Sequence, residues 1–214
     1  YLSEEQVARM KSEAKFFIAY SYFSLFELYG PTPIIDHALP DDLSSFDFPR
    51  ASVDEMVSFI DGLLQEVLNE NLLPPTIYYD ETGNRLETWN LDEMVRPTRA
   101  VVLALRAKLA VYAASKLFNG GYKEALDLRN TDGKQLFPAE DRNKWTIAKS
   151  RLEEFLQFAE SEGYGLYIAK NADGSIDANK SVYNVFQEYN DEIIWATPKN
   201  VMSNNQNNGE ERRF

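Results

Sequence analysis

One stretch near the start of the chain, residues 13–33, constrains the fold more than any other. Between Ala14 and Leu28, apolar and aromatic side chains occur on nearly every side of a helical wheel, so one stripe facing one partner does not account for them. A helix that is apolar all round is predicted to be buried all round. Its uncharged run from Phe16 to Phe26 is far shorter than the roughly 20 residues that a bilayer requires. We therefore expect the central helix of a soluble helical stack.

The composition of the 214-residue chain excludes several classes of function. A formal net charge of −12 would repel nucleic-acid phosphates, and no basic cluster is longer than Arg212-Arg213, so we expect no nucleic-acid partner. The chain has no cysteine, and His37 is its single histidine. A thiolate nucleophile and a multi-histidine metal site are thereby excluded. We predict no catalytic residue, no metal and no cofactor.

Capping signals and helix stops divide the chain into helical segments. Ser3 and Ser52 each begin a capping box, with glutamine or glutamate three residues later. Glycine or proline follows the last apolar position of each segment and prevents the helix from continuing. The four long helices that these signals predict occupy residues 4–29, 53–73, 99–118 and 145–162. The second is amphipathic and is expected to lie back against the first.

Shorter elements are predicted between and after these helices. Residues 76–90 contain a Gly-Asn turn between short runs of tyrosine, isoleucine and tryptophan, which predicts a loop or a hairpin. Residues 166–170 are predicted to be extended, and a short helix is expected around residues 182–186. Residues 192–197 have strand character, although a lone strand needs a partner.

The order of these elements predicts the fold class. Antiparallel helix pairs with inserted loops are typical of tetratricopeptide-type solenoids, but no clean 34-residue period runs through the chain. We predict an all-α fold, a helical-hairpin stack of degenerate tetratricopeptide-like repeats with loop insertions. The helical region is expected to span residues 1–197, and residues 198–214 are expected to form a flexible polar tail.

Two patterns of side-chain oxygens could indicate other kinds of site, a glycosidase carboxylate pair and a calcium loop. A glycosidase needs two carboxylates across a sugar, but neighbours in sequence do not face each other on a helix. The adjacent pairs are Asp41-Asp42, Glu153-Glu154, Asp191-Glu192 and Glu210-Glu211. Oxygens alternate over residues 171–177 as in a calcium loop, but the glycine is misplaced and Val182 stands where a bidentate glutamate is needed. The sequence favours solvated charge and an ordinary turn.

Aromatic residues are abundant, with 12 tyrosines, 13 phenylalanines and 3 tryptophans, and most fall at core positions of the predicted helices. Tyr78, Tyr79 and Trp89 differ because they lie in the polar loop at residues 76–90. Their flat faces could stack on a planar ligand or a sugar ring, and simple packing onto the helices is the alternative. We therefore select Trp89, Tyr78 and Tyr79 as candidate glycan-stacking residues.

Several motifs, taken in order, resemble the SusD/RagB family of outer-membrane lipoproteins. The first helix carries E-A-K-F-F-I-A-Y-S-Y-F and is followed by Y-G-P-T-P, which is similar to the family's opening signature except at Ile18, where the family usually has arginine. Further matches follow in the family's order at residues 50–53, 96–107, 117–120, 145–148, 163–167 and 190–195. The resemblance extends from about residue 5 to residue 197.

This resemblance implies a non-catalytic protein that binds oligosaccharide or polysaccharide at the cell surface. Such a protein delivers the glycan to a TonB-dependent SusC-like transporter in the outer membrane of a Bacteroidetes-type bacterium. Family members are much longer than this chain, which resembles a fragment without the lipid-bearing cysteine, the first segment and the later half. Attachment to the membrane would then depend only on a lipid anchor absent from this chain.

Two other functions remain open at this point. A helical-repeat scaffold could bind a peptide or a protein on its concave face without binding glycan directly. A glycoside hydrolase on a helical fold would need two convergent carboxylates at one of the two hydrolytic separations. The sequence does not identify a glycan, a transporter or an oligomeric state.

Overall fold

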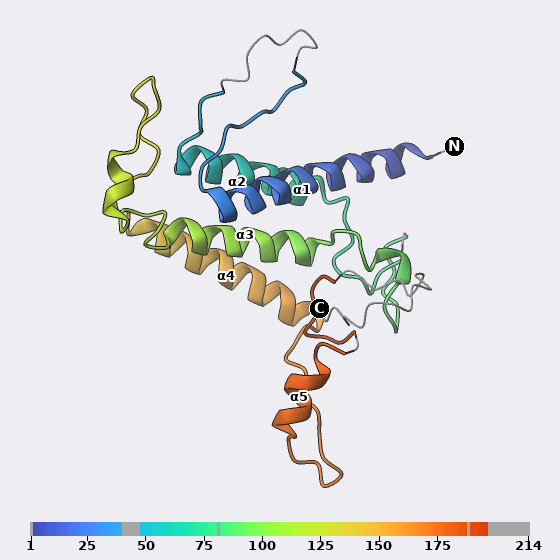
Figure 1. Cartoon of the computed structure of the whole chain (residues 1–214). Helices are drawn as coiled ribbons and strands as arrows, with labels where there is room; N and C mark the ends of the chain where they lie inside the picture. The colour runs from blue at the N-terminus through green and yellow to red at the C-terminus, as the bar shows by residue number, and fades with distance from the viewer. Residues whose placement is uncertain (1, 40–47, 81, 188, 197–214) are drawn as a thin grey trace, which may run out of the picture. The chain divides into compact units, whose positions relative to one another are not determined.

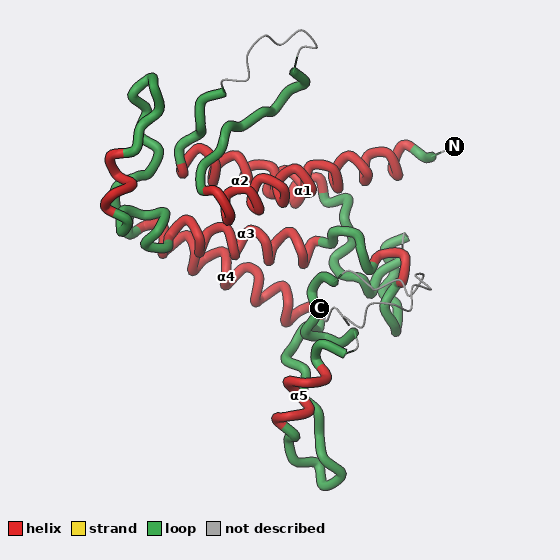
Figure 2. Tube along the Cα trace, in the orientation of Figure 1, coloured by secondary structure: helices red, strands yellow, loops and turns green. Residues whose placement is uncertain are grey.

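The computed structural model describes residues 2–39, 48–80, 82–187 and 189–196 of the chain. Over these residues the regular secondary structure is helical (Figure 2). The β-pairing of these residues consists of three isolated bridges. The five α-helices are α1 (Glu4–Tyr29), α2 (Val53–Glu70), α3 (Arg99–Ala114), α4 (Asn143–Glu162) and α5 (Ala178–Asn184). Two short 3-10 helices occur at Leu91–Glu93 and Lys123–Asp127. The predicted all-α class is confirmed.

The helix boundaries follow local signals closely at the beginnings and less closely at the ends. Ser3 and Ser52 form complete capping boxes, in which each serine hydroxyl accepts a backbone hydrogen bond and the third residue beyond bonds back. α2 ends three residues before the predicted stop because Asn71 adopts a left-handed conformation with φ 54°. Residues 192–196 form turns and irregular chain instead of the predicted strand, and residue 197 lies outside the described residues.

The chain forms two compact units. Unit 1 consists of Tyr1–Leu73 and Val102–Phe155, and unit 2 consists of Pro74–Val101 and Leu156–Phe214. The predicted flexible tail at residues 198–214 lies outside the described part of the chain. Each unit is considered separately below.

Unit 1 is built around antiparallel helices. α1 and α2 pack side by side in opposite directions, as predicted (Figure 1). An ion pair between Lys108 of α3 and Glu27 of α1, with Nζ and Oε1 2.8 Å apart, joins α3 to the first helix. The core is aromatic near the end of α1, where the rings of Phe26 and Phe118 lie 4.3 Å apart between centroids. The fully buried large side chains of these helices include Phe16, Phe23, Phe26, Met56, Ile60, Leu64 and Leu109.

The expectation that α1 is buried on all sides is wrong for the part of the chain that the structure describes. Its buried residues are spaced alternately by four and three positions, which defines one stripe along the helix. On the remaining circumference, Phe17, Ile18 and Leu25 are exposed, and Ile18 retains 46% of its accessible surface. Apolar residues on every side therefore do not require a packing partner on every side.

An ion pair between a buried arginine and a partly exposed aspartate joins α2 to α3 within unit 1. The side chain of Arg106 is only 3% exposed, and its guanidinium donates to both carboxylate oxygens of Asp61, at 2.5 Å from Nε and 3.2 Å from the second nitrogen. Glu154 of α4 lies 4.0 Å from the same guanidinium. A two-pronged arginine–carboxylate contact fixes both the distance and the orientation of the two helices.

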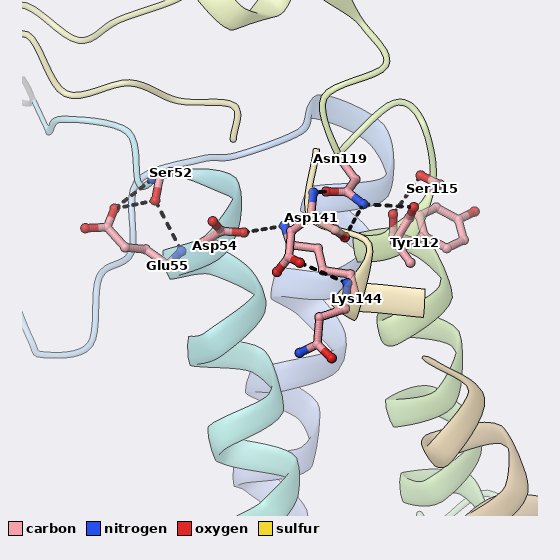
Figure 3. Close-up of polar contacts among 10 residues, drawn as sticks. Ser52, Asp54, Glu55, Tyr112, Ser115, Asn119, Asp141 and Lys144 are labelled. Carbon is pink, nitrogen blue, oxygen red and sulfur yellow. Dashed lines mark hydrogen bonds and ion pairs between the residues drawn. The ribbon is translucent and has the colours of Figure 1, made fainter. Parts of the chain in front are cut away.

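The turn after α3 is fastened by a side-chain amide (Figure 3). The buried Asn119 side chain accepts a hydrogen bond of 2.8 Å from the backbone nitrogen of Asp141 and donates one of 2.9 Å to the Asp141 carbonyl. The amide therefore holds a backbone segment 22 residues away as a neighbouring strand would. Nearby, Lys144 of α4 pairs with Asp54 of α2 at 2.6 Å.

Three loops share one hairpin geometry. Their sequences are D-E-T-G-N at residues 80–84, N-T-D-G-K at residues 130–134 and N-A-D-G-S at residues 171–175. In each loop the first residue bonds through its backbone nitrogen to the fifth, and an antiparallel bridge flanks the turn. The glycines have φ between 82° and 84°, as the three-residue hairpin with a glycine bulge requires. The predicted hairpin within residues 76–90 is the first of the three.

No described helix combines the length and the apolar character that a membrane-spanning segment needs.

Candidate functional site

The loop at residues 77–90 belongs to unit 2 and is closed at its base by backbone hydrogen bonds. The nitrogen of Asn90 donates to the carbonyl of Ile77 at 2.7 Å, and the nitrogen of Leu86 donates to the carbonyl of Tyr78 at 2.7 Å. The Asn90 side chain adds a bond of 3.3 Å to the Tyr79 carbonyl. Trp89 directly precedes the closing residue Asn90, so these hydrogen bonds fix the backbone from which its indole extends.

The predicted residues Tyr78 and Tyr79 are half-buried, and their hydroxyls are engaged within unit 2. Tyr78 donates to the carboxylate of Asp191 at 2.9 Å, and Tyr79 donates to the carboxylate of Glu162 at 3.1 Å. The guanidinium of Arg85 lies 5.9 Å from the centre of the Tyr79 ring and pairs with Glu162 at 3.3 Å. Both phenols thus fasten the loop to segments that follow much later in the sequence.

Trp89 is the most exposed of the three predicted residues, with 38% of its surface accessible. Its ring lies against Tyr189, with the two centroids 5.7 Å apart and the planes tilted by 45°. Trp89 is therefore brought together with a tyrosine that sequence reasoning did not select. We call Tyr78, Tyr79, Trp89, Tyr164 and Tyr189 the aromatic cluster.

Two phenol hydroxyls of the aromatic cluster are buried and have no hydrogen-bond partner among the described residues, those of Tyr164 and Tyr189. Burial raises the pKa of Tyr189 to about 12, and the nearby Tyr78 adds to the effect. Burial also raises the pKa of Tyr164, with further contributions from Tyr189, Tyr78 and the carboxylates of Glu162 and Asp191. These groups influence one another because they lie close together in a poorly solvated region.

Three tyrosines of the aromatic cluster, Tyr78, Tyr164 and Tyr189, should ionise at unusually high pH. Burial, followed by the hydrogen bond to Asp191, raises the pKa of Tyr78 to about 12, and that of Tyr189 is raised to a similar value. A phenol whose pKa is higher in the folded state stabilises the fold fully below its unfolded value of about 10. This stabilisation is expected to be lost as the pH rises from about 10 to about 12. Ultraviolet absorbance should show a late tyrosine fraction, and denaturant unfolding should show falling stability over that range.

The same titration has a clear control. Tyr78→Phe should remove one late-titrating group from the absorbance titration. A single ionisation step near pH 10 for all tyrosines would contradict the burial of the cluster.

The structure assigns local roles to the polar groups that raised other kinds of site. In the loop at residues 171–177, Asp173 accepts hydrogen bonds from the Ser175 nitrogen and hydroxyl at 2.9 and 2.6 Å. Asp177 caps α5 by accepting from the Lys180 nitrogen at 2.9 Å. In the described part of the chain, no three acidic or histidine side chains gather as a metal site would need. The single histidine, His37, is exposed and lies beside Asp36.

The adjacent carboxylates have separate partners where they are described. Asp191 accepts from Tyr78, whereas its neighbour Glu192 accepts from the Tyr167 nitrogen at 2.9 Å. On α4, Glu154 pairs with Arg151 and Glu153 with Lys149. The pairs Asp41-Asp42 and Glu210-Glu211 lie outside the described residues.

Comparison with known proteins places this geometry in context. No known family's sequence profile matches the chain, and no curated protein matches it closely. Among solved structures, "BT4246" is 28% identical, with a TM-score of 0.65 over 78% of this chain. A "laminarin binding SusD-like protein" is 18% identical, with a TM-score of 0.53 over 91% of this chain. "Surface glycan-binding protein A from Bacteroides uniformis" is 15% identical, with a TM-score of 0.54 over the same share.

The chain spans only part of these proteins, since the match covers 27% of the first, 31% of the second and 32% of the third. At such identities the likeness to the second and third concerns the fold. At the level of the fold, this likeness agrees with the SusD-like resemblance that the ordered motifs predicted and with the all-α class.

Proposed function

Because the chain has the fold of SusD-like proteins, we propose that it is part of a non-catalytic protein that binds oligosaccharide or polysaccharide at the cell surface. The longer protein would be lipid-anchored in the outer membrane and deliver its glycan to a TonB-dependent SusC-like transporter for nutrient uptake. The observation that carries the proposal is the aromatic cluster, in which an exposed indole lies against a second aromatic ring.

Glycan binding fits the physical properties of the aromatic cluster. Sugar rings present apolar C–H faces, which stack on flat aromatic side chains without charge or metal. Trp89 offers such a face, while Tyr78 and Tyr79 are tied to Asp191 and Glu162 and hold the loop in place. A fixed aromatic surface loses little conformational freedom on binding, so more of the contact energy remains as affinity.

Replacing Trp89 with alanine should weaken glycan binding about tenfold, which corresponds to roughly 1.4 kcal/mol for one lost aromatic stacking surface. The thermal unfolding temperature should remain nearly unchanged, because the indole is 38% exposed and the loop is closed by backbone bonds. Retardation in a gel that contains polysaccharide measures the first quantity, and differential scanning calorimetry the second.

Trp145→Ala is the matched control, since this tryptophan is 53% exposed on α4 in unit 1 and outside the aromatic cluster. The control should retain glycan binding. A large loss of stability in Trp89→Ala would identify Trp89 as a core residue, and the stacking role would then be abandoned.

A second candidate function rests on the exposed apolar face of α1. Phe17, Ile18 and Leu25 could contribute to binding a protein, as a helical-repeat scaffold without direct glycan contact would. Co-purification with a membrane transporter, together with no retardation by any polysaccharide, would favour the scaffold. Release of reducing sugar during long incubation with the retarding polysaccharide would instead indicate hydrolysis.

A further inference from the structure

Carboxylates are part of the aromatic cluster's immediate surroundings. Asp191 accepts the Tyr78 hydroxyl and lies two residues after Tyr189, whose ring contacts Trp89. Glu162 accepts the Tyr79 hydroxyl. Glu162 is paired with Arg85, whereas among the described residues no ion pair joins a cation to Asp191. A sugar stacked on Trp89 would therefore lie near a carboxylate without a cationic partner.

In unit 2 the negative charges outnumber the positive ones. Over residues 74–101 and 156–196 there are 12 acidic and 5 basic residues, a net charge of −7. Arg85 is paired with Glu162 at 3.3 Å, and Lys180 with Asp177 at 3.2 Å. Arg96 is likewise paired with Glu93 at 3.4 Å. Each of these cations is already within reach of a carboxylate of the protein itself.

We propose that the aromatic cluster takes neutral glycans and discriminates against glycans that carry carboxylate or sulfate groups. This inference rests on the proposed function and specifies its ligand class. Neutral hydroxyls can donate to the spare lone pairs of Asp191 and Glu162, which makes charge-assisted hydrogen bonds. An anionic sugar would instead be repelled by like charge, and dissolved salt would screen that repulsion.

Discrimination by repulsion needs no additional contact to the favoured ligand. A binding site can select between partners by placing an unfavourable charge against the wrong one. The aromatic faces of Trp89 and Tyr189 would contact the apolar side of a neutral or an acidic sugar equally well. The difference in affinity would then come from charge and should respond to ionic strength.

The test uses the full 214-residue chain and isothermal titration calorimetry. Neutral probes are laminarin, xyloglucan, arabinoxylan and mannan, and each one that binds is compared with its own carboxymethylated form. The carboxymethylated probe should bind at least tenfold more weakly at low salt. This difference in affinity should become smaller as the sodium chloride concentration increases. Polygalacturonate and heparin should bind no better than the carboxymethylated probes.

Variants separate local charge from overall charge. Glu162→Gln and Asp191→Asn keep an acceptor oxygen for the two tyrosine hydroxyls while removing a negative charge. Each variant should therefore reduce the ratio of the affinity for the neutral probe to the affinity for the charged probe. Asp132→Asn in unit 1 changes the net charge by the same amount and should leave this affinity ratio unchanged. Equal or tighter binding of the charged probes would overturn this inference but leave glycan binding standing. Failure to bind any glycan, neutral or charged, would contradict the proposed function as well.

Discussion

Gly120→Ala is expected to lower the free energy of unfolding by about 3 kcal/mol, from backbone strain and overpacking together. Gly120 has φ 76°, a conformation that side-chain-bearing residues rarely adopt. An added Cβ would lie 2.3 Å from the backbone nitrogen of Glu140 and 2.8 Å from its Cα. These neighbours cannot retreat easily, because Asn119 holds the adjacent Asp141 through two hydrogen bonds (Figure 3).

A second glycine separates the two causes. Gly133 has φ 84°, but a Cβ there would meet no heavy atom within 4 Å. Gly133→Ala should therefore cost only the backbone term of about 1 kcal/mol. Urea denaturation of both variants measures the difference. If Gly120→Ala cost no more than Gly133→Ala, the close approach of residues 139–140 to this turn would be wrong.

Removing the Asp61 carboxylate is expected to destabilise unit 1 by about 3 kcal/mol, because a buried guanidinium would lose its paired acceptor. The side chain of Arg106 is 3% exposed, and Glu154, at 4.0 Å, cannot replace both hydrogen bonds to Asp61. Asp61→Ala therefore leaves a charge that water reaches poorly. Chemical denaturation gives the free energy of unfolding.

The double variant Asp61→Ala with Arg106→Met distinguishes the effect of an unpaired buried charge from the effect of lost packing. An apolar side chain of similar length needs no acceptor, so the double variant should be more stable than Asp61→Ala alone. Glu153→Ala removes an exposed partner of Lys149 and should change stability by less than about 0.5 kcal/mol. A double variant as unstable as the single one would mean that the ion pair matters through its volume and not its charge.

Features that depend on neighbouring residues could be predicted from the sequence. The capping boxes at Ser3 and Ser52 involve side chains three residues apart, and both formed as expected. The glycine turn predicted a loop or a hairpin over residues 76–90, and a hairpin forms at residues 80–84. The same glycine at the fourth loop position recurs at Gly133 and Gly174, a signal that was available but was not compared between loops.

Features that depend on distant residues could not be predicted. Tyr189 lies 100 positions beyond Trp89, and no spacing rule links the two rings. The hydroxyl of Tyr78 reaches Asp191 across an even longer separation. The exposed side of α1 was mistaken for core because apolar periodicity indicates what could be buried, whereas burial depends on which elements arrive to cover it.

The Asn119 side chain also links the chemical ageing of this chain to its fold. An asparagine followed by glycine is the sequence most prone to lose its side-chain nitrogen as ammonia, and Asn119 precedes Gly120. The product is a carboxylate, which accepts hydrogen bonds but cannot donate to the Asp141 carbonyl. Deamidation would thus break one of the two bonds and place a negative charge where the asparagine is buried. The turn after α3 would then be held less tightly, and the folded chain would be less stable.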